Sequence, residues 1–271
     1  MKEQLINAIL NQLEENSSQL QEKFHDSINE VGVRYFVLDD LLPASIAHQI
    51  FVAFPTKESM RFFNNLRERK YTSKNFEKFN SLLMDITFAF QDPRIVAKLE
   101  KITSISEQVP DPHLYAGGLS AMDRGSFLRP HIDNSHDRER KKYRTLNLLY
   151  YITPDWKIEF GGNLELWNSK VSKNITVESI FNRLVIMETN PWSWHSVSKV
   201  KVDRLRCCVS NYYFSEVSPT GENYFNVTSF SARPEQKLLR SFLWLDKNLR
   251  TAVRYVRSRG FGRDDIYKGP A

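Results

Sequence analysis

The feature that most constrains the fold is a change of residue pattern at Pro110. From there to about residue 230, short apolar runs of β-type composition are separated by turn residues, among them Gly125 and Pro154. The strands expected from these runs are residues 113–121, 126–133, 144–153, 163–167, 174–180, 183–188, 195–202, 205–214 and 223–230. Many short, evenly spaced strands are typical of a closed double sheet, so the pattern predicts a jelly-roll core, also called a double-stranded β-helix.

Helical spacing of apolar residues is found on both sides of this core. Residues 3–30 show this spacing, and a short strand is expected within 35–43. Further helices are expected at residues 44–54, 57–69, 76–90 and 93–107. Pro43 and Pro93 stand near two of the helix starts, where proline is favoured. After Pro234 helical spacing returns, which predicts a C-terminal helix followed by a polar tail.

These patterns together predict an α+β protein. All-β cores with helical additions often reach this length as one unit, so we expect a single domain over residues 1–271. Its expected parts are a mainly helical segment at 1–107, the jelly-roll core at 110–230, and a basic C-terminal helix and tail at 231–271.

The sequence also indicates where the protein works. Its longest apolar runs are too short to span a membrane, and the N-terminal MKEQLINAILNQLEEN is amphipathic and acidic, unlike a signal peptide. The two cysteines, Cys207 and Cys208, are adjacent and cannot link distant segments, which suits a reducing compartment. We therefore expect a cytoplasmic protein that is not transmembrane.

The positive charge is concentrated at the C-terminus. Residues 233–271 contain ten Lys or Arg against four Asp or Glu, which accounts for the whole net charge of +6. This segment is either a solvated helix face with a tail or a docking surface for an anionic partner, such as a phosphorylated sugar, a lipid headgroup or an acidic protein. No nucleic-acid partner is expected, because no nucleic-acid-binding motif accompanies the charge.

Three residues form a candidate metal site. His131 and Asp133 are two positions apart, so on an extended strand their side chains leave the same face, and His195 can supply a third ligand. Two imidazoles and one carboxylate leave coordination positions open. This ligand set favours a non-haem Fe(II) oxygenase over a closed structural zinc site.

Several ordered landmarks carry a resemblance to a known family. They are HIDN at 131–134, LYYITPDW at 149–156, GGNLELW at 161–167, FNRLVIM at 181–187, His195, and Arg206 with the YYF that follows it. Over about residues 113–216 the chain resembles the 2-oxoglutarate- and Fe(II)-dependent dioxygenases, in the prolyl 4-hydroxylase-like branch. One position departs from the family pattern, because Ala121 and Met122 stand where members often carry an aromatic residue.

The resemblance implies a role for each cofactor-binding residue. His131, Asp133 and His195 would hold Fe(II). Arg206 would pair with the far carboxylate of 2-oxoglutarate, with Arg204 as the fallback on the same strand face. Tyr151 would place a hydroxyl against that carboxylate, and Ser210 would be a weaker contact. Dioxygen is the further co-substrate, and ascorbate is a candidate reductant.

The resemblance also implies the reaction and leaves the substrate open. Hydroxylation of an unactivated C–H bond, with release of succinate and CO2, is the expected outcome, although desaturation uses the same ligands. Asn147, Trp194 and His136 are the candidate substrate-binding residues. Basic residues near the site favour a small or carbohydrate-like anionic substrate.

Other readings of the same residues stay open. They are a peptidyl or free prolyl hydroxylase, a non-catalytic jelly-roll binding protein, and a zinc hydrolase that uses the same three ligands with a bound water. A zinc hydrolase has no need for Arg206 as a carboxylate clamp, so this residue distinguishes it from an oxygenase.

Overall fold

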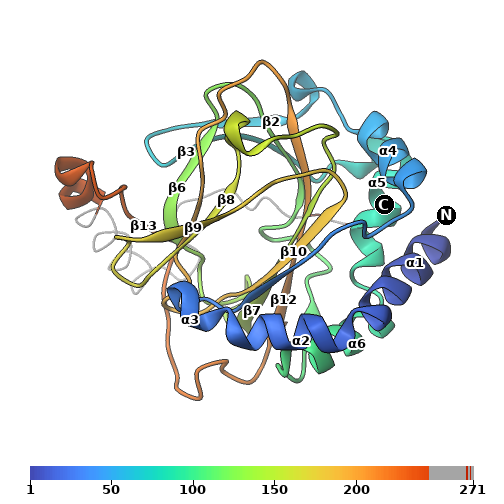
Figure 1. Cartoon of the computed structure of the whole chain (residues 1–271), viewed down its shortest axis with the longest axis horizontal. Coiled ribbons are helices and arrows are strands. Elements are labelled where there is room, and N and C mark those ends of the chain that lie inside the picture. Colours follow the sequence, from blue (N-terminus) through green and yellow to red (C-terminus); the bar gives the residue numbers. More distant parts are fainter. Residues whose placement is uncertain (244–266, 268, 270–271) are drawn as a thin grey trace.

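A strongly curled β-sheet with helices along its outer side forms the molecule (Figure 1). The computed structural model describes residues 1–243 together with Tyr267 and Gly269. Residues 237–243 are helical and begin the expected C-terminal helix. The rest of that helix and most of the basic tail lie outside the described residues.

The helices are concentrated in the N-terminal part of the chain. They are α1 (Lys2–Glu15), α2 (Ser17–Asp26), α3 (Ile28–Val31), α4 (Ala44–Ala53), α5 (Ser81–Ala89) and α6 (Pro93–Thr103), with short 3₁₀ turns η1 (Lys57–Ser59), η2 (Phe76–Lys78) and η3 (Ile158–Phe160). Local sequence explains the start of α6. Pro93 occupies its first turn, and the Asp92 side chain accepts a hydrogen bond from the Arg94 backbone N–H, which satisfies a free donor at the helix end.

The strands join into one antiparallel sheet. They are β1 (Tyr35–Leu38), β2 (Arg61–Asn64), β3 (Glu68–Ser73), β4 (Val109–Pro110), β5 (Gly118–Met122), β6 (Phe127–Ile132), β7 (Tyr143–Tyr151), β8 (Leu164–Trp167), β9 (Asn174–Val177), β10 (Arg183–Glu188), β11 (His195–Val197), β12 (Arg206–Ser215) and β13 (Ser229–Phe230). Their main order is β1-β10-β7-β12-β5-β3-β6-β11-β8-β9. The curled sheet with its helical layer confirms the expected α+β class and jelly-roll core.

Strand alternation divides the core into two layers. On β10, Leu184 and Ile186 are buried in the cluster that includes the apolar faces of the N-terminal helices. Val185 and Met187 point to the other side and pack with interior residues of the curled sheet. A strand buried on both faces is expected to show a continuous apolar run, and LVIM at 184–187 is such a run, without alternating polar residues.

The expectation of a helix at residues 57–69 is wrong. This segment holds one turn of 3₁₀ helix and then β2, which pairs with β3 in a hairpin. Strand β3 in turn pairs with both β5 and β6, so it joins the two halves of the sheet. Apolar spacing alone could not reveal this. The hydrogen bonds of β3 go to the edges of β5 and β6, and these strands come much later in the sequence. Two of the observed strands begin later than expected. In the segments 113–121 and 223–230, strand pairing begins only at Gly118 and Ser229.

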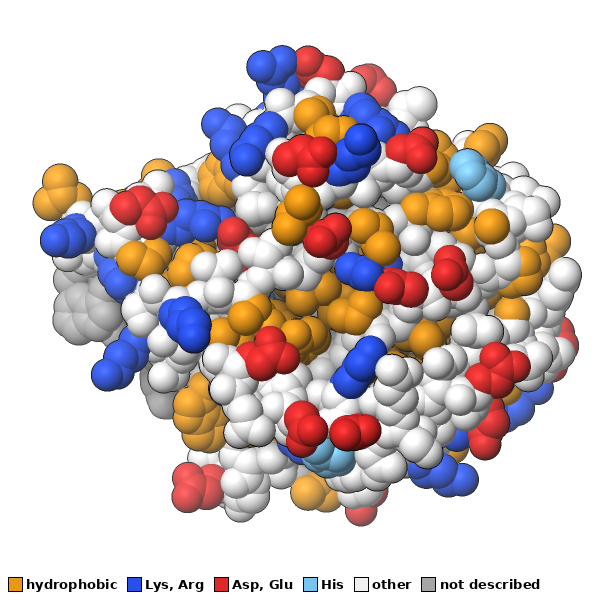
Figure 2. Space-filling view, in the orientation of Figure 1, with side chains coloured by type: hydrophobic (Ala, Val, Ile, Leu, Met, Phe, Trp, Pro, Cys, Tyr) orange, Lys and Arg blue, Asp and Glu red, His pale blue; other side chains and the backbone are white. Residues whose placement is uncertain are grey.

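The surface on one face carries charges of both signs. In Figure 2, Lys and Arg side chains are interspersed with Asp and Glu around hydrophobic side chains near the middle of the view. Among the described residues, every helix is too short or too polar to cross a membrane.

Asp123 anchors the β2–β3 hairpin to the turn between β5 and β6. Its carboxylate accepts hydrogen bonds from Lys57 Nζ at 3.0 Å, Arg69 Nη1 at 3.0 Å and Ser126 Oγ at 2.9 Å. Burial opposes its ionisation, but these donors and the two cations outweigh burial and lower the pKa of Asp123.

We predict that Asp123→Asn lowers the free energy of unfolding by roughly 1–3 kcal/mol at neutral pH, because the donors lose a charged acceptor. The depressed pKa sets the pH dependence. The advantage of the wild type is fully present above the unfolded-state pKa of about 3.9 and is lost as the pH falls through the folded-state value. Urea unfolding at a series of pH values measures this difference in stability between the wild type and the variant.

Asp203→Asn is the matched control, since Asp203 is largely exposed in its ion pair with Arg124. Equal losses for the two variants at neutral pH would contradict the prediction.

Candidate functional site

Two paired strands bring the candidate metal ligands together. His131 lies near the end of β6, Asp133 follows this strand directly, and His195 begins β11. Strands β6 and β11 pair antiparallel, and His195 stands directly opposite His131 in the register. The two imidazole ring centroids are 4.1 Å apart. Residues 64 positions apart in the chain therefore present their rings at one point.

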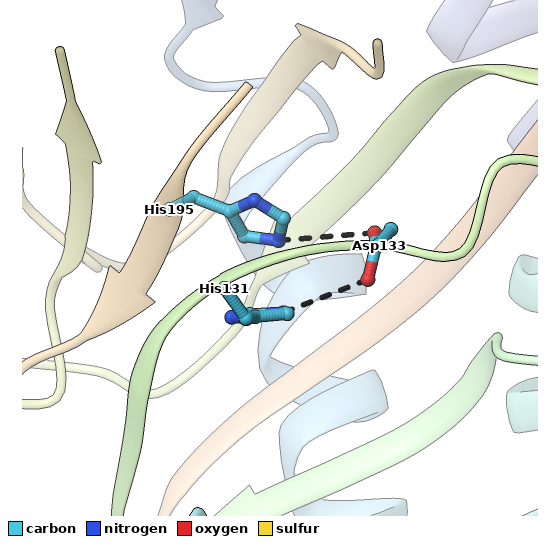
Figure 3. Close-up of side chains that lie close together, drawn as sticks. All are labelled: His131, Asp133 and His195. Carbon is cyan, nitrogen blue, oxygen red and sulfur yellow. Dashed lines mark ion pairs between the residues drawn. The ribbon is translucent and has the colours of Figure 1, made fainter. Parts of the chain in front are cut away.

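The three side chains point toward one another (Figure 3). One ligand atom from each lies within 4.8 Å of the others. Asp133 Oδ1 is 3.5 Å from His131 Nε2, and Asp133 Oδ2 is 3.8 Å from His195 Nε2. All three residues are buried. Within the described residues, this is the group of His, Cys, Asp and Glu that has the spacing of a metal site.

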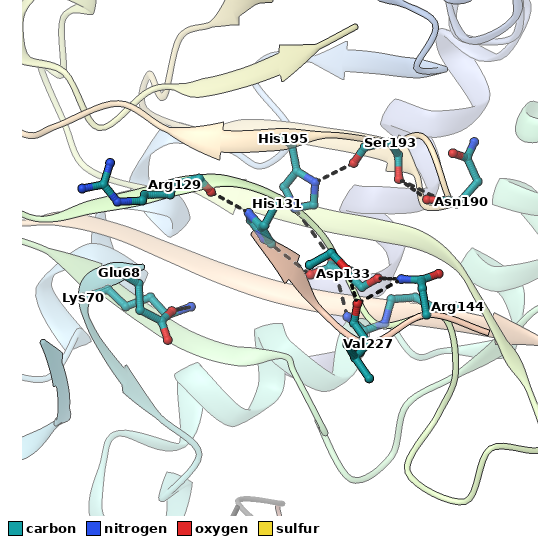
Figure 4. A network of polar contacts seen from close by, with 12 residues as sticks. Glu68, Lys70, Arg129, His131, Asp133, Arg144, Asn190, Ser193, His195 and Val227 are labelled. Atoms are coloured by element: carbon teal, nitrogen blue, oxygen red, sulfur yellow. Dashed lines mark hydrogen bonds and ion pairs between the residues drawn. The ribbon is translucent and has the colours of Figure 1, made fainter. Parts of the chain in front are cut away.

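Backbone carbonyls orient both imidazoles for ligation. His131 Nδ1 is 2.9 Å from the Arg129 carbonyl, and His195 Nδ1 is 3.0 Å from the Ser193 carbonyl (Figure 4). A carbonyl only accepts, so each Nδ1 carries the proton and each Nε2 keeps its lone pair for a metal. Outer hydrogen bonds of this kind hold ligand rings in place.

The electrostatics favour the protonation state that a metal needs. Burial opposes the ionisation of Asp133, but the charge of Arg144 and the contacts with His131 and His195 outweigh it and hold the pKa of Asp133 well below its usual range. Burial, followed by the repulsion of His131, lowers the pKa of His195 to about 4. At neutral pH the site therefore offers an ionised carboxylate and a neutral imidazole, as metal binding requires.

These ligands line a cavity of about 530 Å³ inside the curled sheet. Its walls come from β5, β6, β7, β11 and β12, and the β2–β3 hairpin covers one side. Tyr151, Asn147, Arg206 and Ser210 all line this cavity together with the three metal-site residues. Trp194 and His136 do not belong to its lining. His136 instead lies against the ring of Tyr143, with centroids 4.4 Å apart.

Arg206 and Tyr151 have buried polar atoms that lack a partner. Arg206 is 4% exposed, and its Nε finds no hydrogen-bond acceptor among the described residues. The Tyr151 hydroxyl is also buried without a partner in that part of the chain, and burial raises its pKa, so it stays protonated as a donor. The guanidinium lies 5.2 Å from the centroid of the Tyr151 ring. Buried donors without acceptors are costly, so this pair fits a carboxylate ligand such as the far end of 2-oxoglutarate.

The glycine turn before β8 leaves room for Arg206. Gly161 and Gly162 have φ angles of 71° and 70°, as turn glycines can. A Cβ on Gly162 would lie 3.2 Å from Arg206 Cδ. Arg204, the fallback, is exposed and donates to the carbonyls of Pro154 and Asp155, so it does not enter the cavity.

Sequence reasoning missed Arg144, which also lines the cavity. If side chains alternate regularly from Tyr151, Asn147 and Leu149 point into the cavity. Arg144, an odd number of residues away from Tyr151, would then point outward. The pairing of β7 with β12 shifts by one residue between Tyr213 and Phe214, so Arg144 stands opposite Phe214 and returns to the inner face. We find no sequence signal that announces this bulge.

The comparisons with known proteins agree with this geometry. Residues 117–214 match the family model described as the 2OG-Fe(II) oxygenase superfamily, a segment that contains His131, Asp133, His195 and Arg206. No curated protein matches the chain.

Solved structures show the same fold. A prolyl 4-hydroxylase from Pseudomonas putida matches with a TM-score of 0.55 and 14% identity, over 72% of this chain and 98% of its own. A prolyl hydroxylase from Trichoplax adhaerens, in complex with a peptide of hypoxia inducible factor, matches with a TM-score of 0.52 and 16% identity, over 76% and 93%. SnoN, a non-haem α-ketoglutarate-dependent epimerase of nogalamycin biosynthesis, matches with a TM-score of 0.51 and 13% identity, over 83% and 89%. At these identities the likeness establishes the fold and leaves the substrate open.

We predict that His195→Ala lowers the affinity for Fe(II), or for Co(II) as a spectroscopic substitute, by at least about 100-fold, because loss of a ligand exceeds the usual effect of losing an outer hydrogen bond. Absorbance titration with Co(II) under anaerobic conditions measures it. His136→Ala is the matched control, since it removes a nearby imidazole outside the metal group. Unchanged Co(II) affinity in His195→Ala would remove this residue from the site.

Proposed function

We propose that this chain is a 2-oxoglutarate- and Fe(II)-dependent dioxygenase, the activity of the superfamily whose model matches residues 117–214, and that it hydroxylates an unactivated C–H bond of a small, anionic, carbohydrate-like substrate. One observation carries the proposal. The candidate metal ligands share one cavity with two buried guanidinium groups, those of Arg144 and Arg206.

In this proposal His131, Asp133 and His195 hold the iron. When bound, iron with 2-oxoglutarate and dioxygen supplies the oxidation of a C–H bond, with succinate and CO2 as the products of the co-substrate. The three ligands come from β6, the residue after it and β11, so they approach from one wall of the cavity. The opposite side stays open to co-substrate and substrate.

Arg206 and Tyr151 hold the far carboxylate of 2-oxoglutarate. Each brings a buried donor that lacks an acceptor in the described chain, and a carboxylate oxygen can satisfy both. Ser210 lines the same cavity, directly opposite Leu149 across the β7–β12 pair. Its hydroxyl adds a weaker contact to the same carboxylate.

The charge of the cavity supports an anionic substrate. Basic residues outnumber acidic ones in its charged lining: Arg61, Arg67, Lys70, Lys74, Arg144 and Arg206, against Glu68 and Asp133. Glu68 and Lys70, which both line the cavity, form an ion pair at 2.9 Å (Figure 4). The face shown in Figure 2 carries both signs, whereas the charged residues that line the cavity are mostly basic.

The cavity volume supports a small substrate. About 530 Å³ must hold 2-oxoglutarate and the reacting part of the substrate together. Ligand cavities for single small molecules commonly span about 300–1,000 Å³. A monosaccharide-sized acid fits this space, and its hydroxyl groups can bond to the amide of Asn147 on the cavity wall.

Three alternatives make different use of the same residues. Prolyl hydroxylation has support from the shared fold, but a neutral prolyl group offers no charged acceptor to the unpartnered Nε and Nη2 of Arg144. A zinc hydrolase or a non-catalytic binding protein has no need of the unpartnered Arg206 and Tyr151 donors beside the metal ligands. The proposal therefore turns on whether 2-oxoglutarate binds there.

We predict a visible charge-transfer band when metal-free protein receives Fe(II) and then 2-oxoglutarate under anaerobic conditions. Arg206→Ala is expected to lower the 2-oxoglutarate affinity at least about tenfold, because a charged hydrogen-bond pair is lost. Tyr151→Phe removes one neutral hydroxyl and is expected to weaken binding less.

Arg204→Ala is the matched control, since its guanidinium lies outside the cavity and bonds only to backbone carbonyls. The absence of a band in folded, iron-loaded wild type would favour the hydrolase or the binding protein. A band with equal 2-oxoglutarate affinity in Arg206→Ala would refute the assigned role of Arg206.

We predict that small anionic sugars stimulate succinate formation more than neutral sugars of the same size, free proline or prolyl peptides do. The physical reason is the buried guanidinium of Arg144, which lines the cavity and has two nitrogens without an acceptor among the described residues. Succinate release with each compound, at matched ionic strength, measures the preference. Stronger stimulation by a neutral prolyl peptide would move the protein to the peptidyl hydroxylase alternative.

A further inference from the structure

We propose that Arg144 is the specificity residue of this site and binds an oxyanion of the substrate beside the metal ligands. The inference rests on the proposed function and deepens it, because it names the residue that recognises the substrate and the group that it recognises. Arg144 lies on β7, next to Asp133 in Figure 4.

The bulge in β7 places Arg144 in the cavity. Phe214 stands opposite Arg144, and Tyr213 stands opposite Leu146, so Thr145 is the extra residue on this strand. Without the extra residue, the Arg144 side chain would point away from the cavity that Asn147 lines. Bulges next to functional sites commonly re-aim a side chain in this way.

The guanidinium of Arg144 is buried without a full set of acceptors. The residue is 1% exposed, and its Nε and Nη2 have no hydrogen-bond partner among the described residues. These two nitrogens form one edge of the planar guanidinium, the edge that can donate two parallel hydrogen bonds to an oxyanion. Aromatic rings support the cation, with the Tyr212 centroid at 4.2 Å and the Phe214 centroid at 5.5 Å.

The ion pair with Asp133 does not use that edge. Arg144 Nη1 lies 3.4 Å from Asp133 Oδ2, which is longer than a charged hydrogen bond. Asp133 Oδ2 itself has no hydrogen-bond partner in the described chain. Asp133 thus orients Arg144 through one nitrogen and leaves the Nε–Nη2 edge for a ligand.

Charge balance indicates that the ligand is negative. With iron and 2-oxoglutarate bound, the charges of iron and Arg206 are balanced by those of Asp133 and the two co-substrate carboxylates. The positive charge of Arg144 is then left over in a buried position, where an unpaired charge is costly. A substrate carboxylate, sulfate or phosphate would supply the missing negative charge.

The position of Arg144 also limits which substrate carbon reacts. Its guanidinium touches the carboxylate of a metal ligand, so a bound oxyanion lies close to the metal. The carbon that is hydroxylated must therefore be within a few bonds of the oxyanion. Asn147 Oδ1, buried and also without a partner in the described residues, lies on the same wall and can accept a bond from a neighbouring substrate hydroxyl. This pattern of groups fits a hydroxylated acid such as an acidic sugar.

Calorimetric titration with small oxyanions tests the proposal without turnover. Sulfate, inorganic phosphate and acetate are titrated into protein that carries Zn(II) and 2-oxoglutarate, so that Arg206 is occupied and no oxidation occurs. Wild type is expected to bind at least one of them, and the order of affinity identifies the oxyanion. Arg144→Gln should weaken this binding at least about tenfold, and Arg144→Lys, which keeps the charge without the two-pronged edge, should weaken it less.

Two controls separate this result from other causes. Arg124→Gln removes the same charge from a side chain that is 65% exposed outside the cavity, so it should leave oxyanion affinity unchanged. Repeating the titration on metal-free Arg206→Gln protein reports on Arg144 even if the co-substrate assignment fails. Metal content and unfolding curves establish that each variant is folded and loaded. Oxyanion binding that is absent from wild type, or equal in wild type and Arg144→Gln, would overturn the proposal.

Discussion

The antiparallel pairing of β6 with β11 is the interaction on which the site depends. It sets His195 directly opposite His131, and the chain leaves β6 at the position where Asp133 completes the group. The backbone carbonyls of Arg129, in β6, and Ser193, just before β11, then orient the two rings. Because side chains alternate along a strand, a slip of one residue would turn His195 away from the cavity.

The interior of the sheet contains two buried guanidinium groups whose hydrogen-bonding capacity the described residues do not fully satisfy. Arg206 and Arg144 are both almost fully buried, and both have nitrogens without acceptors in the described residues. Aromatic rings beside each guanidinium offset part of the cost of burial. Groups that cost free energy in the ligand-free protein are common where ligands bind, since a ligand with the complementary charge recovers that energy.

The N-terminal elements support this interior in two ways. Helices α1, α2, α5 and α6 cover the outer face of the sheet, where Leu184 and Ile186 are fully buried. The β2–β3 hairpin instead enters the sheet, joins β5 to β6 and brings basic residues to the cavity. Asp123 ties this hairpin to the β5–β6 turn, so the cavity wall and the metal-ligand strand are held in one framework.

The sequence by itself determined the features that follow from local spacing. Short strands between turn residues predicted the jelly roll, the two-residue step from His131 to Asp133 put both on one side, and alternation from Tyr151 put Asn147 and Leu149 on the cavity face. Only the tertiary structure decided which edges β3 fills, which residue faces His195, and where β7 bulges to turn Arg144 inward. The physical reason is that register and bulges arise from pairing between distant strands, and a single strand carries no record of its partner.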